Sequence, residues 1–329
     1  MEFPKEMITI AKDVDKSLMA YLDVGKHEKL RKAMKHYPEA GGKRMRPVMA
    51  ILVADAVGKQ GSKAMPFGCS LEIIHNFTLV HDDVIDQDPV RRGRPAVHVL
   101  FDMPTAIIAG DALFAIAYEV LAETDVGLED LRTIFHSVSE TVYLIAEGQQ
   151  MDVDFEGTDT VKIDEYVEMV EKKTAVLFAC AAEGGAIIGG GTKRQVKDMK
   201  EYARRMGIGF QMWDDVLGIK GDTKKTGKPV GSDIRNGKRT LIIVHAMEHL
   251  KDGSKDKATL LEALGNERAT DAQVNKAIGI LEKTGSIEYA RSEALRYAKE
   301  AKQKLDCLKP SREKDVLAAL VDFAVGRDA

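Results

Sequence analysis

The chain has 329 residues, of which 44% are hydrophobic and 30% are charged, and its formal net charge is −4. This is the composition of an ordinary globular protein, and the balanced charge excludes a general attraction to nucleic acid or to an anionic membrane. The three cysteines, Cys69, Cys180 and Cys307, form neither a CxxC pair nor a zinc-binding spacing, so we expect reduced cysteines in the core of a cytoplasmic protein.

No segment predicts a signal peptide or a membrane-spanning helix. Met1 to Lys16 carries charges throughout. The most apolar region, Ala175 to Gly191, is shorter than the ~20 apolar residues of a spanning helix and is interrupted by Glu183. We therefore expect no stable membrane insertion, and we expect this Ala- and Gly-rich region to form a helix packed closely against its neighbours.

Apolar residues recur at intervals of three and four along most of the chain. Three such stripes run from Cys69 to Val84, from Leu113 to Leu121 and from Tyr166 to Ala181. We find no convincing pair of strands, and none of the intervening breakers is long and polar enough to link two domains. The pattern predicts an all-α fold of roughly 10–13 helices in a single domain that covers residues 1–329.

A basic cluster lies early in the chain, in Gly41-Gly42-Lys43-Arg44-Met45-Arg46-Pro47. It opens a strongly apolar helix, and the N-terminus of a helix favours anions. Such a cluster by itself is more often a solvated face than a binding site.

The stretch Asp82-Asp83-Val84-Ile85-Asp86, a DDxxD pattern, is expected at the C-terminal end of a helix, because Pro89 and Gly93 follow it. Asp82 and Asp86 are spaced i, i+4 and project from one face. Acids at this end of a helix are unfavourable for the helix dipole, which indicates that they bind cations. Carboxylates without cysteine or histidine ligands favour Mg²⁺. A solvated acidic helix end explains the five-residue pattern equally well.

Three arginines follow this motif, in Pro89-Val90-Arg91-Arg92-Gly93-Arg94-Pro95. Arginine binds phosphate through two parallel hydrogen bonds, so acids followed by an arginine loop match a metal–diphosphate complex. The alternative is an ion-paired surface loop.

A second acidic motif, Asp214-Asp215, follows another helical run and precedes a glycine-containing basic loop, residues 221–238. A further basic feature, Lys172-Lys173-Thr174, precedes the Ala-rich helix. Two acidic helix ends with several basic clusters predict two diphosphates and a shared set of Mg²⁺ ions. Nothing resembles a Ser-His-Asp triad, a P-loop or a dinucleotide fingerprint.

At these residues the chain resembles the trans-isoprenyl diphosphate synthases, the family of farnesyl and geranylgeranyl diphosphate synthases. The resemblance rests on Gly42 to Pro47, the first acidic motif with Arg91-Arg92-Gly93, Gly110-Asp111, Gly148-Gln149, Lys173-Thr174, Gln211 to Asp215, and Gly227-Lys228-Pro229 to Lys238-Arg239-Thr240.

The resemblance implies a bundle of helices around a deep central cavity, usually a homodimer, that joins isopentenyl diphosphate to allylic diphosphates with about three Mg²⁺ ions per site. It implies that isopentenyl diphosphate is held by Lys43, Arg46, His75 and Arg92. It implies that the allylic diphosphate is held by Arg91, Lys173, Thr174, Gln211, Lys228 and Lys238. Of these, Lys173 and Lys228 are also implied to take part in catalysis. The implied direct Mg²⁺ ligands are Asp82, Asp86 and Asp214, with Asp83 and Asp215 orienting metal-bound water and neighbouring cations.

One departure from the family pattern concerns the second motif. Family members commonly carry an aspartate at its fifth position, where this chain has Gly218. Asp222, four residues further on, cannot simply replace it. We therefore expect the second motif to hold metal mainly through Asp214. The first motif has an extra acid, Asp88, to which no role is assigned.

Product length is expected to depend on Phe77 and Thr78, which lie five and four residues before Asp82. Phe77 lies about 7.5 Å deeper along the helix axis and could form the floor of the pocket for the growing chain, although an ordinary core position fits equally well. In the family, aromatic residues at both positions go with a C15 product. Phe77 with the small Thr78 resembles the C20 pattern, which favours geranylgeranyl diphosphate over C15, C25 or longer products.

Other classes of protein share some of these features. A terpene cyclase or squalene-type synthase has a helical fold and an aspartate motif, but it does not need the isopentenyl diphosphate site around Lys43 and Arg46. A non-catalytic subunit of a heteromeric synthase is opposed by the intact aspartates, although Gly218 leaves this alternative open. A non-enzymatic protein that binds Mg²⁺ or Ca²⁺ would explain the carboxylates but not the ordered basic loops.

Overall fold

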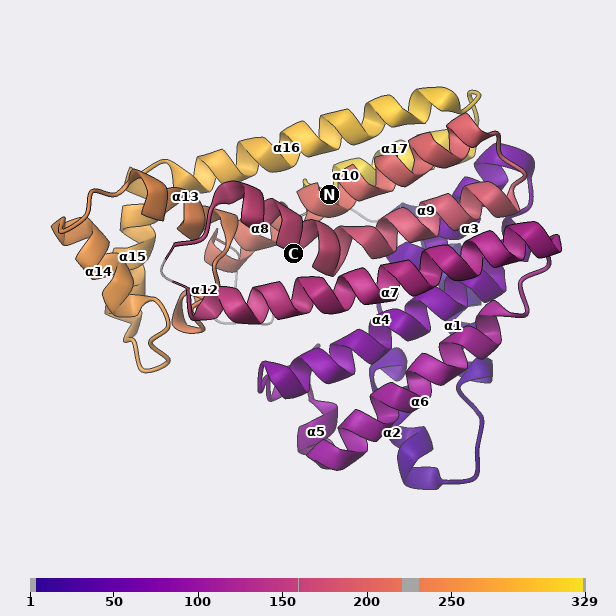
Figure 1. Cartoon of the computed structure of the whole chain (residues 1–329), viewed down its shortest axis with the longest axis horizontal. Helices are drawn as coiled ribbons and strands as arrows, with labels where there is room; N and C mark the ends of the chain where they lie inside the picture. Colours follow the sequence, from indigo (N-terminus) through magenta and orange to yellow (C-terminus); the bar gives the residue numbers. More distant parts are fainter. Residues whose placement is uncertain (1–3, 159, 221–230, 328–329) are drawn as a thin grey trace.

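The structure is a computed structural model that describes residues 4–158, 160–220 and 231–327. Helices make up almost all of it (Figure 1). Its elements are α1 (Lys5–Tyr21), α2 (Glu28–Glu39), α3 (Met45–Gly58), η1 (Gly61–Ala64), α4 (Met65–Ile85), β1 (Val90–Arg91), β2 (Arg94–Pro95), α5 (Val97–Leu100), α6 (Met103–Leu121), α7 (Leu128–Glu156), α8 (Ile163–Val170), η2 (Glu171–Ala175), α9 (Val176–Ile188), α10 (Lys193–Lys220), α12 (Ser232–Arg235), α13 (Leu241–His249), α14 (Lys255–Ala263), α15 (Asp271–Lys283), α16 (Ser286–Lys304), η3 (Leu305–Cys307) and α17 (Arg312–Ala324).

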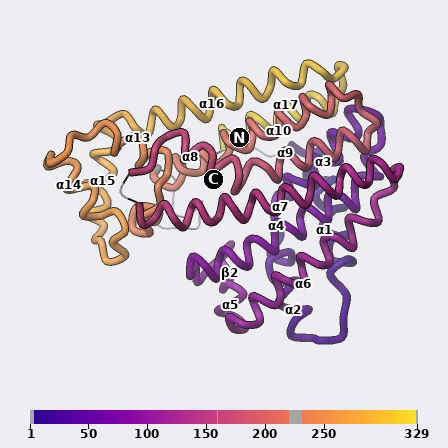
Figure 2. Tube along the Cα trace, viewed as in Figure 1, coloured from indigo at the N-terminus to yellow at the C-terminus, as the bar shows by residue number. Residues whose placement is uncertain are grey.

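The long helices pack side by side. Figure 1 shows α16, α10, α9 and α7 following one another across the molecule, and α4 and α6 form a second packed pair. The trace in Figure 2 follows the same order, with α14 and α15 at one end. The buried apolar side chains form one hydrophobic cluster, to which helices from α1 to α17 contribute. The all-α prediction is confirmed, and 13 helices of at least eight residues are described when α8, η2 and α9 count as one continuous helix.

The Ala- and Gly-rich helix α9 is buried among its neighbours, as its composition predicts. A Cβ atom at Gly185 would lie 2.4 Å from the backbone oxygen of Ala50 in α3, and one at Gly184 would lie 2.2 Å from the ring of Phe67 in α4. Glycine is therefore required at both positions, because any side chain would push the helices apart.

Two local features differ from the expectation of plain helices joined by loops. Strands β1 and β2 form a small antiparallel hairpin, with Val90 opposite Pro95, so the expectation of no strand pair is wrong here. Two-residue strands are too short to show the alternation by which strands are found in a sequence. The turn is made by Arg92 and Gly93, both with positive φ (52° and 72°), as in the two-residue turns favoured in hairpins.

The second difference is a π-helical turn, η2, which joins α8 to α9. The stripe from Tyr166 to Ala181 predicts an unbroken helix, and periodicity does not resolve one extra residue within a turn. Single π turns inside α-helices are found frequently at functional sites.

Helix α6 is long and apolar enough, by length and composition alone, to cross a membrane, and 39% of that segment is buried inside the protein. Its buried face, which includes Ala106, Gly110 and Leu113, belongs to the tight packing with α4. Its other face exposes Ile107 and Ile108. The stripe from Leu113 to Leu121 predicts part of this helix, but the expectation that no segment is long and apolar enough to span a membrane is wrong for α6 by that test. The cytoplasmic location stays a prediction.

Candidate active site

The two acidic motifs occupy different positions in their helices. Helix α4 ends at Ile85, with Asp86 directly after it, so the first motif lies at a helix end as predicted. Asp214 and Asp215 lie more than one turn before the end of α10 at Lys220, so the prediction of a second acidic helix end is wrong. Gly218 does not stop the helix, because one glycine costs a helix only about 1 kcal/mol.

Lys238 brings together three elements that are distant in the sequence. Its Nζ atom lies 3.4 Å from Asp86 Oδ2, at the end of α4, and 3.6 Å from Asp152 Oδ2, in α7. Burial lowers the pKa of Lys238, but the carboxylates of Asp152 and Asp86 outweigh it and raise that pKa above its ordinary value. The lysine is therefore a permanent positive charge between two carboxylates.

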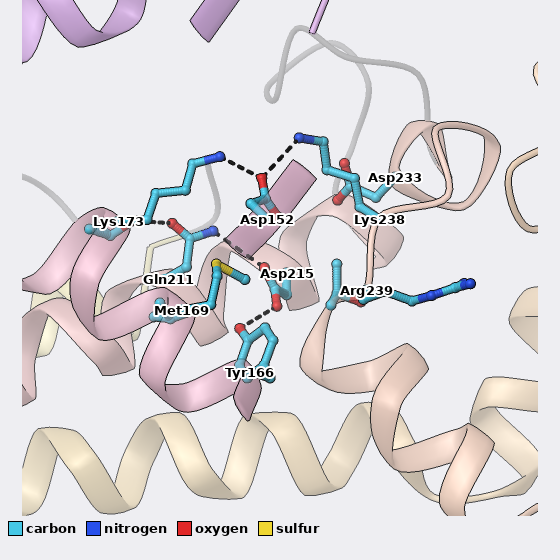
Figure 3. A pocket seen from close by; sticks show the side chains of 12 residues that line it. Asp152, Tyr166, Met169, Lys173, Gln211, Asp215, Asp233, Lys238 and Arg239 are labelled. Carbon is cyan, nitrogen blue, oxygen red and sulfur yellow. Dashed lines mark hydrogen bonds and ion pairs between the residues drawn. The ribbon is translucent and has the colours of Figure 1, made fainter. Parts of the chain in front are cut away.

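The pocket around this charge has a volume of about 120 Å³. Figure 3 shows the side chains that line it. Lys173 and Lys238 approach Asp152 from opposite sides, and the Lys173 Nζ–Asp152 Oδ2 distance is 2.5 Å. Thr174 Oγ1 donates to Gln211 Oε1 at 3.3 Å. Four of the residues predicted to hold the allylic diphosphate, Lys173, Thr174, Gln211 and Lys238, thus lie around one pocket, together with Asp152, which the sequence analysis missed.

Asp152 lies four residues after Gly148 in α7, which places both on one face of that helix. A Cβ atom at Gly148 would lie 2.3 Å from the backbone nitrogen of Lys173 in the π turn. A Cβ atom at Gly207 in α10 would lie 2.8 Å from the Cα atom of Ala175. The π turn therefore packs between two glycines, and this contact explains the glycine of the Gly148-Gln149 motif. The i, i+4 spacing from Gly148 is the signal that could have pointed to Asp152.

Asp83 is fully buried and is engaged by two partners. Arg91 donates from Nε to both carboxylate oxygens, at 2.7 and 2.8 Å, and the Tyr37 hydroxyl donates to Oδ2. The predicted part of Asp83 in orienting neighbouring cations agrees with this pairing. The predicted contact of Arg91 with a diphosphate stays a prediction.

Asp82 differs from its neighbour. Within the described residues its side chain makes no hydrogen bond or ion pair, and it lies close enough to Asp86 and Lys173 for their charges to act on it. Burial raises the pKa of Asp82 to about 6, and the negative charge of Asp86 adds to the rise while Lys173 opposes it. A cation bound here would relieve this repulsion.

The residues predicted to hold isopentenyl diphosphate line a second pocket, of about 290 Å³. Lys43, Arg46, His75 and Arg92 all contribute to its wall, and Arg46 lies over the ring of Phe178, at 4.4 Å from its centroid. The structure therefore brings this predicted set together.

The cationic side chains of this pocket favour the binding of an anion. Burial lowers the pKa of Arg46 to about 10, with the charge of Arg92 adding to the effect and Glu72 opposing it. Burial also lowers the pKa of His75 well below its ordinary value, helped by both arginines, so the imidazole is neutral near pH 7. The buried Nε atom of Arg46 has no hydrogen-bond partner among the described residues. A buried donor beside clustered cations is costly unless an anion binds.

Arg44 has a structural function in this region. Its guanidinium donates to Asp15 at 2.6 Å and to Glu72 at 2.8 Å, and both groups are used in holding α1, α3 and α4 together. The carboxylate of Glu72 thus forms its ion pair with Arg44. The neighbouring Lys43 and Arg46 remain the cations that face the pocket.

Asp214 is paired with Arg327, a residue after the last helix. The Arg327 guanidinium lies over the Phe210 ring, 3.9 Å from its centroid, and its carbonyl accepts a hydrogen bond of 3.0 Å from the indole of Trp213. The C-terminal segment thus contacts the second motif through Arg327. Nothing in the local sequence around Arg327 predicts this contact, because its partners are more than 100 residues away.

Asp215 is buried and accepts hydrogen bonds from the Tyr166 hydroxyl at 2.6 Å and from the backbone nitrogen of Leu241 at 3.2 Å. Burial raises the pKa of Asp215 to about 7, although the bond from Tyr166 opposes the rise. Through its hydrogen bond with Leu241, Asp215 therefore holds the first residue of α13 beside the pocket.

Phe77 is packed in an aromatic cluster between α4 and α6. Its ring centroid lies 5.1 Å from that of His81 and 5.6 Å from that of Phe114. Phe114 in turn contacts Tyr118, with centroids 5.1 Å apart. The hydroxyl of Thr78 donates to the backbone oxygen of His75 at 2.9 Å. Phe77 thus lies on the inward face of α4, as its place on the stripe predicts.

Lys228, which was predicted to bind the allylic diphosphate, lies outside the described residues, as does Asp222. Within residues 4–158, 160–220 and 231–327, no three carboxylate, histidine or cysteine side chains converge to hold a metal ion by themselves. Mg²⁺ typically uses one or two carboxylates and takes its other ligands from water and phosphate. The oxygen-only donors and the mutual repulsion at Asp82 fit such an ion.

Comparison with known proteins agrees with this site. The family model described as Polyprenyl synthetase matches residues 27–281. The chain is 40% identical over 315 residues to a geranylgeranyl diphosphate synthase of Methanosarcina mazei, covering 96% of this chain and 95% of that protein. It is 36% identical over 330 residues to a geranylfarnesyl diphosphate synthase of Natronomonas pharaonis, covering 95% and 94%. The crystal structure of geranylgeranyl pyrophosphate synthetase from Pyrococcus horikoshii Ot3 matches with a TM-score of 0.93 and 38% identity over 98% of both chains.

Proposed function

Since the chain belongs to the polyprenyl synthetase family and is a prenyltransferase, we propose that it condenses isopentenyl diphosphate with allylic diphosphates and releases geranylgeranyl diphosphate, the C20 product. The observation that carries the proposal is the pair of neighbouring pockets. One is lined by the cations Lys43, Arg46 and Arg92 beside the Arg44–Glu72 ion pair, and the other sets Lys173 and Lys238 beside acidic side chains. Two anionic substrates, one of them bound with metal, match this arrangement.

In the proposed reaction, the bond between C1 and the diphosphate of the allylic substrate breaks, and the double bond of isopentenyl diphosphate attacks the resulting cation. A new carbon–carbon bond forms, and the proton lost is taken by the departing diphosphate. Mg²⁺, held by Asp82, Asp86 and Asp214, would neutralise the leaving group. Lys173 and Lys238 would leave their ion pairs with Asp152 and form ion pairs with the same diphosphate. The reaction requires that water is excluded from the cation, because water would otherwise quench it.

The assay that tests the function uses purified protein, Mg²⁺, isopentenyl diphosphate and, separately, allylic primers of 5, 10 and 15 carbons. We expect a C20 product from each primer, separated by chromatography after removal of the diphosphate. A C25 main product would instead match the geranylfarnesyl relative. Absence of chain extension with every primer would contradict the proposal.

Phe77→Ser is expected to lengthen the main product beyond C20. The Phe77 ring lies on the face of α4 that packs against α6, where it contacts the ring of Phe114. Removing the Phe77 ring opens space for about one isoprene unit or more along the axis of α4. The measurement is the product distribution of the variant, with Thr78→Ser as the matched control that keeps the aromatic floor. An unchanged distribution would place the floor elsewhere.

We also propose that the protein is a homodimer joined through α5 and α6. Five large apolar side chains are exposed on these two consecutive helices, Val99, Leu100, Met103, Ile107 and Ile108, and exposed apolar surface of this kind marks interaction sites. Light scattering during size-exclusion chromatography should report twice the 36.2 kDa mass of one chain. Ile108→Asp should shift the protein toward the single-chain mass. A wild-type protein with the mass of one chain would refute the dimer.

A further inference from the structure

The second acidic motif lacks a carboxylate at its fifth position, Gly218, yet the structure places one there. A Cβ atom at Gly218 would lie only 2.6 Å from Oδ2 of Asp233, a residue of α12. From standard bond lengths, the carboxylate oxygens of an aspartate lie about 2.4 Å from its own Cβ atom. The Asp233 oxygen is therefore about as far from this Cβ position as an oxygen of an aspartate at position 218 would be.

The backbone holds Asp233 in this place. The amide of Gly231, at the start of α12, donates to the carbonyl oxygen of Gly218 at 3.2 Å. Gly231 has a φ of 73°, and a Cβ atom there would lie 2.3 Å from the side chain of Val274, so glycine is required. On the other side, the backbone nitrogen of Lys238 donates to the carbonyl oxygen of Asp233 at 3.0 Å. These two backbone hydrogen bonds hold Asp233 between the second motif and Lys238.

The carboxylate of Asp233 belongs to the same pocket as the residues described above. Figure 3 shows it beside Lys238, among the residues that line the pocket with Asp152 and Asp215. The negative charge of Asp233 also acts on Asp215 within this pocket. Burial is the main cause that raises the pKa of Asp215, and the charge of Asp233 raises that pKa further. In α10, position 218 lies four residues after Asp214, so a carboxylate beside Gly218 is on the face of α10 that carries Asp214.

We propose that Asp233 supplies the missing carboxylate of the second acidic motif and binds Mg²⁺ together with Asp214, which exchanges its ion pair with Arg327 for the metal ion. The inference rests on the proposed function only in taking Mg²⁺ and a diphosphate as the ligands of this pocket. It replaces the expectation that the second motif holds metal mainly through Asp214. It also gives Gly218 a physical reason, since a side chain there would require the Asp233 carboxylate to move from its present position.

The test measures Mg²⁺ binding by calorimetry in the presence of inorganic diphosphate, without turnover. Asp233→Asn, which keeps the shape of the side chain, and Asp233→Ala are each expected to weaken Mg²⁺ binding by about tenfold or more. The double variant Gly218→Asp with Asp233→Ala moves the carboxylate from α12 to α10 and is expected to recover most of the lost affinity. Circular dichroism melts check that all variants fold.

Two results would overturn the proposal. One is Mg²⁺ binding by Asp233→Asn equal to that of the wild type. The other is a folded double variant that recovers none of the affinity, together with weaker binding of diphosphate to Asp233→Ala in EDTA, since Asp233 would then only position Lys238. Failure of the proposed function is seen separately, as a wild-type protein that binds Mg²⁺ and diphosphate but extends no primer.

Discussion

Asp82→Ala is expected to lower the rate of chain extension by on the order of a thousandfold or more, while the protein stays folded. The carboxylate is proposed to hold the metal that neutralises the leaving group, and losing such a contact removes several kcal/mol of transition-state stabilisation. Within the described residues Asp82 has no hydrogen bond or ion pair that its removal would break. The measurement is the steady-state rate with isopentenyl diphosphate and an allylic primer at saturating Mg²⁺.

The same substitution is expected to leave stability in EDTA unchanged or slightly higher. Because the folded protein raises the pKa of Asp82 to about 6, above its unfolded value of 3.8, the charged form is penalised by folding. The stabilising contribution of the protonated form is complete below the unfolded pKa and is lost as the pH rises through about 6. At pH 7 the alanine variant is free of this penalty. A near-normal rate, or a collapse of the melting temperature, would contradict the assignment.

Asp83→Ala, one residue further on, is expected to have the opposite profile: it destabilises the fold by about 3–5 kcal/mol, because it leaves the guanidinium of Arg91 and the hydroxyl of Tyr37 without their buried acceptor. Asp83 is fully buried and the Arg91 side chain is only 23% exposed, so solvent screens the pair weakly. The measurement is the free energy of unfolding from urea denaturation in EDTA.

Matched variants separate charge from packing in this pair. Tyr37→Phe removes the hydroxyl that donates to Asp83 and accepts from the backbone nitrogen of Val97 at 3.2 Å, and it should cost about 1–3 kcal/mol. Replacing both partners, in Asp83→Leu with Arg91→Met, should recover most of the stability lost in Asp83→Ala, because no charge is left buried alone. An Asp83→Ala variant as stable as the wild type would show that the Asp83–Arg91 pair does not stabilise the fold. If the double replacement were no more stable than Asp83→Ala, packing rather than the unpaired charge would explain the loss.

The contrast between Asp82 and Asp83 marks a limit of local sequence information. The pattern of the motif identifies three acids near a helix end, and the i, i+4 spacing of Asp82 and Asp86 follows from helix geometry alone. Which acid is engaged by a buried arginine depends on the hairpin of Arg91, and that hairpin is too short to be recognised from alternation. The assignment of Asp83 therefore required the structure.

The second motif shows the same limit over longer distances. The sequence identifies Asp214 and Asp215 but predicts that their helix ends there, whereas α10 continues to Lys220. Arg327 reaches Asp214 from the end of the chain. Asp152 joins Lys173 and Lys238 from α7. None of these contacts lies within the span of one helix turn, which is the range over which spacing carries information.

The sequence by itself determined the helical class, from periodicity at three and four, and the basic and acidic clusters, most of whose pocket residues were assigned through the resemblance to a known family. These properties depend on neighbours along the chain. The tertiary structure decided how the charges are paired: Asp83 with Arg91, Asp152 with two lysines, and Asp233 beside Gly218. Pairing depends on which helices pack together, and the free energy of a buried charge is set by the partner that the fold brings to it.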